Sequence, residues 1–90
     1  MGRKRNRIDI VYDMLSAIQK KGGRIKPTHL MYKANLSHTQ MNTYLDDLLD
    51  KSIVDKVKEE KYDYLIITDK GHEFITKIKE MKEFEDTFGL

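Results

Sequence analysis

The chain lacks cysteine and tryptophan and has one proline among its 90 residues. The absence of thiols excludes disulfides, thiolate metal sites and a cysteine nucleophile. Long hydrophobic runs are absent too, because the longest, Tyr64 to Ile67, has four residues, against the roughly 20 that a membrane-spanning helix needs. The composition therefore predicts a globular protein without a membrane segment, with the cytoplasm as its default location.

Residue patterns that would support catalysis or cofactor binding are also missing from the sequence. The histidines at positions 29, 38 and 72 share no metal-ligand spacing. The aspartates of the segment 46–50 lack the alternating ligand loop and the turn glycine of a calcium site. No glycine-rich phosphate loop follows an expected strand. We therefore expect a protein that is not an enzyme and that holds no metal, cofactor or small-molecule ligand.

Positive charge is concentrated at the start of the chain, although the formal net charge is only +2. The first 36 residues carry nine Lys or Arg against two Asp, and the rest carries eight against thirteen acidic residues. Such clustering can attract a polyanion such as a nucleic acid. The alternative is a solvated tail followed by a solvated helix end, where Lys20 and Lys21 complement the helix dipole.

Apolar residues at steps of three and four predict a first helix over residues 7–21. Gly22-Gly23 then ends the pattern, as glycines do after a helix C-terminus. Residues 24–26 are expected to form a short extended link. Pro27 suits the opening of a second helix, because its missing N–H leaves no bond unmade there, and this helix should run to Ala34.

A third helix is expected over residues 37–51 after a break of three residues. Asn35 can adopt the left-handed conformation that stops a helix, and Ser37 with Gln40 forms a capping box. The apolar positions have the spacing of a core-facing helix; they are Met41, Tyr44, Leu45, Leu48 and Leu49. Two short helices joined by a tight turn form a helix-turn-helix, whose second helix enters the major groove of DNA.

The other face of this third helix carries neutral hydrogen-bonding side chains, namely His38, Thr39, Asn42 and Thr43. Such groups can pair with base edges without the repulsion that a carboxylate would meet near phosphates. The alternative is structural, because Ser37 and Gln40 have capping roles and Thr39 can simply solvate the first turn. Asp46, Asp47 and Asp50 follow on the same helix and should lie beyond the groove or face the wing.

Strand-like alternation replaces the helical period after residue 52. Residues 53–58 and 62–67 alternate and predict a β-hairpin. Its turn lacks Asn-Gly or Asp-Gly, so we expect a loop longer than two residues. Thr68 then caps a last helix, with Asp69 in its first turn.

Three strings carry a resemblance to a known family: "RIDIVYDMLSAI", "THLMYKANLSHTQMNTYLDDLLDKSIV" and "YLIITDKGHEFI". They resemble small archaeal winged helix-turn-helix DNA-binding proteins, both regulator-like and chromosomal, some of which dimerise through a C-terminal antiparallel coiled coil. The resemblance covers nearly the whole chain. It implies a mainly α fold with a small β-hairpin, a basic arm over 1–7, a winged helix-turn-helix domain over 8–68 and a dimerisation helix over 69–90.

The resemblance also implies double-stranded DNA binding by a transcriptional regulator or chromosomal protein associated with the nucleoid. The residues expected at the DNA are Arg3, Lys4, Arg5, Arg7, Lys26, Thr28, Tyr32, Lys33, Ser37, His38, Thr39, Gln40, Asn42, Thr43, Lys58 and Lys61. Those expected in a homodimer are Phe74, Ile78, Met81, Phe84 and Phe88. The alternatives are a winged helix that docks proteins and one that binds RNA, since fold does not settle function.

Overall fold

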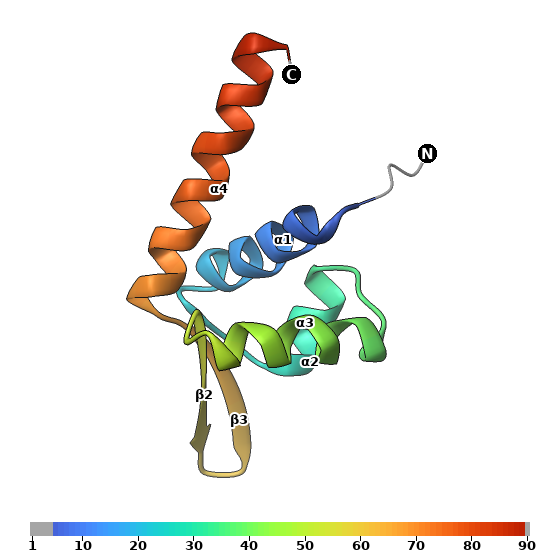
Figure 1. Cartoon of the computed structure of the whole chain (residues 1–90). Coiled ribbons are helices and arrows are strands. Elements are labelled where there is room, and N and C mark those ends of the chain that lie inside the picture. Colours follow the sequence, from blue (N-terminus) through green and yellow to red (C-terminus); the bar gives the residue numbers. More distant parts are fainter. Residues whose placement is uncertain (1–4, 90) are drawn as a thin grey trace.

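The computed structural model describes residues 5–89. In this part of the chain the elements run α1 (Arg7–Lys20), β1 (Arg24–Ile25), α2 (Pro27–Lys33), α3 (His38–Asp50), β2 (Val54–Glu59), β3 (Tyr62–Ile67) and α4 (Asp69–Phe88). Figure 1 shows α4 and the β2–β3 hairpin projecting in opposite directions from the body formed by the other helices. The expected class, mainly helical with a small sheet and a wing, is confirmed. None of the helices within residues 5–89 is long and apolar enough to cross a membrane.

Local signals set both ends of α1 and the end of α2. Asn6 caps α1 by accepting the N–H of Asp9, whose carboxylate accepts the N–H of Asn6 in return. At the other end, Gly22 and Gly23 have φ angles of 86° and 92°. Asn35 follows α2 with a φ of 54°, as its short polar side chain allows. These ends confirm the predicted helices to within a few residues.

The sheet has three strands, in the order β1–β3–β2, where the sequence predicted only a hairpin. The expected extended link is β1, which pairs with β3 through Arg24↔Ile66 and Ile25↔Leu65. The expectation of a longer hairpin loop is wrong, because Glu59 pairs with Tyr62 and only two residues connect the strands. Glu60 takes a φ of 54° there, in the position where glycine or asparagine is usual.

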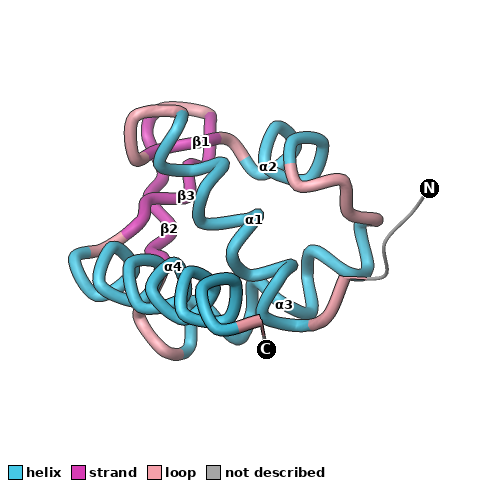
Figure 2. The backbone as a smooth tube through the Cα atoms, turned by 90° about the horizontal axis from the view of Figure 1, so that it is seen from above, coloured by secondary structure: helices cyan, strands magenta, loops and turns pink. Residues whose placement is uncertain are grey.

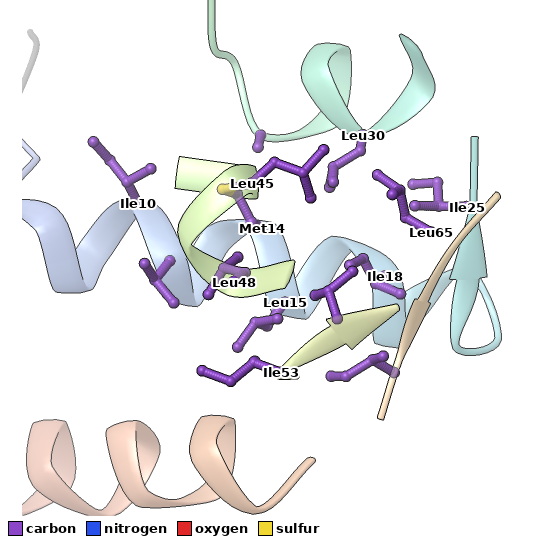
Figure 3. Packing of buried hydrophobic residues seen from close by; sticks show 14 of the residues in the cluster. Ile10, Met14, Leu15, Ile18, Ile25, Leu30, Leu45, Leu48, Ile53 and Leu65 are labelled. Carbon is purple, nitrogen blue, oxygen red and sulfur yellow. The ribbon is translucent and has the colours of Figure 1, made fainter. Parts of the chain in front are cut away.

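The core lies between α1 and the elements around it (Figure 3). Met14, Leu15 and Ile18 on α1 are fully buried, and they pack with Leu30, Leu45 and Leu65 from α2, α3 and β3. Seen from above, α1 lies between α4 on one side and α2 on the other (Figure 2). This arrangement holds α3 and the hairpin against one body, so that both can present side chains to the same partner.

Thr68 and Gly71 anchor the start of α4. The Thr68 hydroxyl accepts the N–H of Gly71 at 3.0 Å and lies 2.7 Å and 3.0 Å from the carbonyls of Ser52 and Ile53. Gly71 is buried, and a Cβ at this position would lie 2.3 Å from the Ile53 carbonyl oxygen. The Thr-x-x-Gly string therefore joins the wing to α4 through a contact that only glycine permits.

Candidate nucleic-acid interface

The start of α3 is fixed by the predicted capping box. Ser37 Oγ accepts the N–H of Gln40 at 3.1 Å, and Gln40 Oε1 accepts the N–H of Ser37 at 3.0 Å. Both side chains are exposed but already occupied by these bonds. Their predicted contact with DNA stays a prediction, and their structural role is to set where the helix begins.

His38, Thr39, Asn42 and Thr43 are all exposed on the first half of α3. The Asn42 amide lies 3.3 Å from Nδ1 of His38, and the Thr43 hydroxyl donates to the Thr39 carbonyl at 3.0 Å. These contacts orient the side chains and leave several donors and acceptors directed to solvent. Side chains of this kind, held in place on a helix, are suited to reading base edges.

A hollow of about 130 Å³ lies beside these residues, where α2, α3 and the wing meet. Met31, Met41 and Leu45 give it an apolar floor, and its polar rim consists of Thr28, His38, Asn42 and Lys56. Lys56 was missed by the sequence-based prediction. Alternation along β2 could have identified it, because Lys56 and Lys58 share one face of the strand with the buried Val54.

The remaining predicted contacts near this surface are exposed. Thr28 and Tyr32 lie four residues apart on the outer side of α2, and the Tyr32 residue is 80% exposed. Lys58 and Lys61 lie at the far end of the wing. Asp46 and Asp50 are exposed on the second half of α3, where they would repel phosphates. The surface suited to DNA is therefore the first half of α3, the outer side of α2 and the wing.

Arg5, which precedes α1, and Arg7, its first residue, both form contacts within the protein. Arg5 donates to the carbonyls of Ala34 and Asn35, both at 2.7 Å, and forms an ion pair with Asp13 at 3.0 Å. Arg7 forms an ion pair with Asp47. Arg3 and Lys4 lie outside the described residues. Arg5, in the described part of the expected arm, therefore holds the turn between α2 and α3.

Charge pairing at Asp47 and Arg24 shifts the ionisation of both groups. The pKa of Asp47 is lowered, mainly by the hydrogen bond from Lys51, with the charges of Lys51 and Arg7 adding to the effect. The pKa of Arg24 is raised further above its high ordinary value, mainly by its hydrogen bond to Glu59 and then by Tyr64. Both groups therefore stay ionised at neutral pH and bind their partners within the protein.

Lys26 and Lys33 do not face the hollow beside α3. The Lys26 ammonium lies 4.1 Å from the centre of the Tyr62 ring. Lys33 lines two other hollows with Lys20, on the edge of α2 that faces α1. Both lysines were expected to contact DNA, which stays a prediction, and the hollows that they line share no residue with the hollow beside α3.

The predicted dimer residues divide into two groups along α4. Ile78 is buried in the core of its own chain, and Phe74 is half-buried against that core. Met81, Phe84 and Phe88 are 43%, 55% and 65% exposed. The rings of Phe84 and Phe88 lie 4.7 Å apart. The apolar surface that could meet a partner is therefore the second half of α4.

Comparisons with known proteins agree with this architecture. A family model described as winged helix-turn-helix matches residues 4–86. Two uncharacterized proteins of Methanocaldococcus jannaschii are 32% and 31% identical to the chain over 87% and 89% of its length. The chain spans 34% of the first relative and 76% of the second.

Solved structures with the same fold include two named as DNA-binding proteins. Sso10a-2, a DNA-binding protein from Sulfolobus solfataricus, has a TM-score of 0.82 at 23% identity, over 93% of this chain and 85% of that one. F93 from STIV, a winged-helix DNA-binding protein, has a TM-score of 0.76 at 22% identity, over 91% and 92%. At these identities the likeness concerns the fold. With the family match over residues 4–86, it leads to the conclusion that the chain belongs to the winged helix-turn-helix family.

Proposed function

We propose that this protein binds double-stranded DNA and acts on chromosomal DNA as a transcriptional regulator or structural protein. In this proposal the first half of α3 enters the major groove, while the wing and the outer side of α2 contact the backbone. The observation that carries it is the exposed, neutral, hydrogen-bonding set His38, Thr39, Asn42 and Thr43 beside the wing lysine Lys56. The related folds that are named as DNA-binding proteins support it.

Alternative partners are less well matched by this surface. A protein-docking winged helix would be expected to expose apolar side chains at α3, but the floor of the hollow there is small and partly buried. An RNA duplex has a major groove too deep and narrow for side chains to read, so a helix that exposes base-reading side chains suits DNA better.

Binding should be measured by fluorescence anisotropy with a random-sequence DNA duplex, the same sequence as RNA duplex, and single-stranded DNA, each at two salt concentrations. The DNA duplex is expected to bind most tightly, with an affinity that falls as salt rises. Folded protein that shows no affinity for the DNA duplex at low salt would overturn the proposal in favour of protein docking. Tighter binding of RNA would overturn it in favour of RNA recognition.

We also propose that two copies assemble through the second halves of their α4 helices. Met81, Phe84 and Phe88 offer an exposed apolar patch, and a two-fold axis lets each copy present the same patch to the other.

A further inference from the structure

Within residues 5–89, a second surface carries five of the nine Lys and Arg side chains that form no ion pair there. We call it the basic face and define it as Lys20, Lys21, Arg24, Lys26, Lys33 and Lys79, all of them exposed. These residues line three neighbouring hollows that share members. Lys20 and Lys33 line two of the hollows, and Lys21 joins one of these to the third. The basic face is therefore continuous from α4 across the end of α1 to β1 and α2.

The lysines of the basic face are not neutralised within the described part of the chain. The ion pairs found in residues 5–89 involve none of these five lysines. Arg24 pairs with Glu59, and the single acidic residue lining the three hollows, Asp13, pairs with Arg5. The face therefore keeps a net positive field directed to solvent.

Helix ends account for only part of this cluster. Lys20 lies in the last turn of α1 and Lys33 in the last turn of α2, where a cation complements the helix dipole. Lys79, in contrast, lies in the middle of α4, and Lys26 precedes α2. Residues from four elements are brought to one surface, which the dipole effect does not require.

The basic face is separate from the α3 surface. His29 and Lys33, four residues apart, lie on one edge of α2 and line a hollow with α1. Thr28 and Met31 line the hollow beside α3. The two hollows share no residue, so a partner can occupy one without displacing the other.

We propose that the basic face binds the sugar–phosphate backbone of duplex DNA, as a contact surface distinct from α3. This inference rests on the proposed function and assigns the sequence-independent part of the affinity to a place on the molecule. Lysine acts as a flexible point charge, so five lysines around open hollows suit a dense line of phosphates better than a single shaped anion. A lipid surface is a poorer match, because the apolar lining residues Ile25 and Ile75 are buried and cannot insert.

The test compares two triple variants with the same loss of charge. Lys20→Gln, Lys33→Gln and Lys79→Gln remove cations of the basic face. Lys51→Gln, Lys70→Gln and Lys77→Gln remove exposed cations that already have partners within the protein. Affinity for a random-sequence DNA duplex is measured by fluorescence anisotropy from about 50 to 200 mM salt, the range over which phosphate contacts have a large effect. Circular dichroism checks that each variant is folded.

Each lost phosphate contact lowers the slope of log affinity against log salt by about 0.9, so the first variant should lose about 2 to 3 from the slope. Its affinity at the lowest salt should fall by more than tenfold, and the control should keep a slope close to that of the unchanged protein. Equal slopes for the two variants would overturn the basic face while leaving DNA binding through α3 intact. No binding by the unchanged protein would overturn both proposals together.

Discussion

The two edges of α2 lead to surfaces of different chemistry. On one edge, Thr28 and Met31 border the hollow beside α3, where the exposed groups are mostly neutral hydrogen-bond donors and acceptors. On the other edge, Lys33 borders hollows lined by unpaired lysines. One surface offers directional hydrogen bonds and the other offers charge. A helix of seven residues is enough to keep them apart.

This difference suggests that the two surfaces of this small domain contribute differently to DNA binding. Hydrogen bonds to base edges discriminate between sequences, whereas contacts to phosphates supply affinity that is independent of sequence. Lys56 of the wing is the basic residue that lines the hollow beside the start of α3, and Asp46 and Asp50 follow on the same helix. Affinity and discrimination should therefore respond to different substitutions, which can be tested one surface at a time.

The largest effect is expected from Gly71→Ala, which should remove both surfaces together. The added Cβ would lie 2.3 Å from the Ile53 carbonyl oxygen and 2.6 Å from Cγ1 of Ile67, so the junction between the wing and α4 must shift. Such overpacking should cost about 3 kcal/mol in the free energy of unfolding. Urea denaturation followed by circular dichroism measures this cost.

Glu73→Ala, at an exposed position on the same helix, is the control and should change the free energy of unfolding very little. If Gly71→Ala were as stable as this control, the tight contact at the junction would not constrain the fold. If Gly71→Ala is destabilised as expected, its affinity for both random and preferred DNA duplexes should fall together with its stability.

The next effect concerns assembly and should lower the DNA affinity of both surfaces equally. Phe84→Ala with Phe88→Ala removes the two most exposed phenylalanines of α4. The dimer dissociation constant should rise at least about a hundredfold, equivalent to about 2.7 kcal/mol. Sedimentation equilibrium at micromolar concentration should show the mass falling from twice 10.7 kDa to 10.7 kDa. Glu83→Ala serves as a control on the same helix, and a mass of 10.7 kDa for the unchanged protein would rule the dimer out.

A smaller and more selective effect is expected from Asn42→Ala or Thr43→Ala. Both side chains are exposed and lie off the apolar stripe, so folding should be nearly unchanged. Discrimination between a preferred duplex, selected from a random pool, and a random duplex should fall by about 1–3 kcal/mol. The salt slope on random DNA should stay the same, because no phosphate contact of the basic face is removed.

Asp50→Ala, on the same helix but beyond the reading segment, should leave this discrimination unchanged. Ser37→Ala is a poor alternative, because loss of the cap costs about 1 kcal/mol of stability by itself. Competition binding with the two duplexes measures the effect. A change in salt slope without a change in discrimination would show that Asn42 and Thr43 contact phosphates.

Local signals made the helices predictable from the sequence. The capping box of Ser37 and Gln40, the left-handed Asn35 and the Thr68 cap each depend on residues within a few positions of one another. Hydrophobic spacing likewise identified the buried faces of α1 and α3. Interactions of such short range depend only on residues that are close together in the sequence, so they can be predicted from it.

Features that depend on distant parts of the chain were not predictable in this way. β1 has two residues, too few to show alternation, and it is a strand only because β3 lies beside it. The hairpin loop is short although Glu60 is an unfavourable residue for a positive φ, because six pairs between β2 and β3 hold it. The positions of Arg5 and Lys33 also depend on packing, which decided that one binds a turn and the other faces α1.

β1 also sets the order in which the chain can fold. Its partner strand lies on the far side of α2, α3 and β2 in the sequence, since Arg24 pairs with Ile66. Closing so long a loop costs entropy, and only the contacts formed between β1 and β3 offset this cost. The helices and the hairpin can form early from nearby residues, whereas β1 has to wait for β3. Folding of this domain should therefore be slower than that of a helical bundle of the same length, with the last step taken at the sheet.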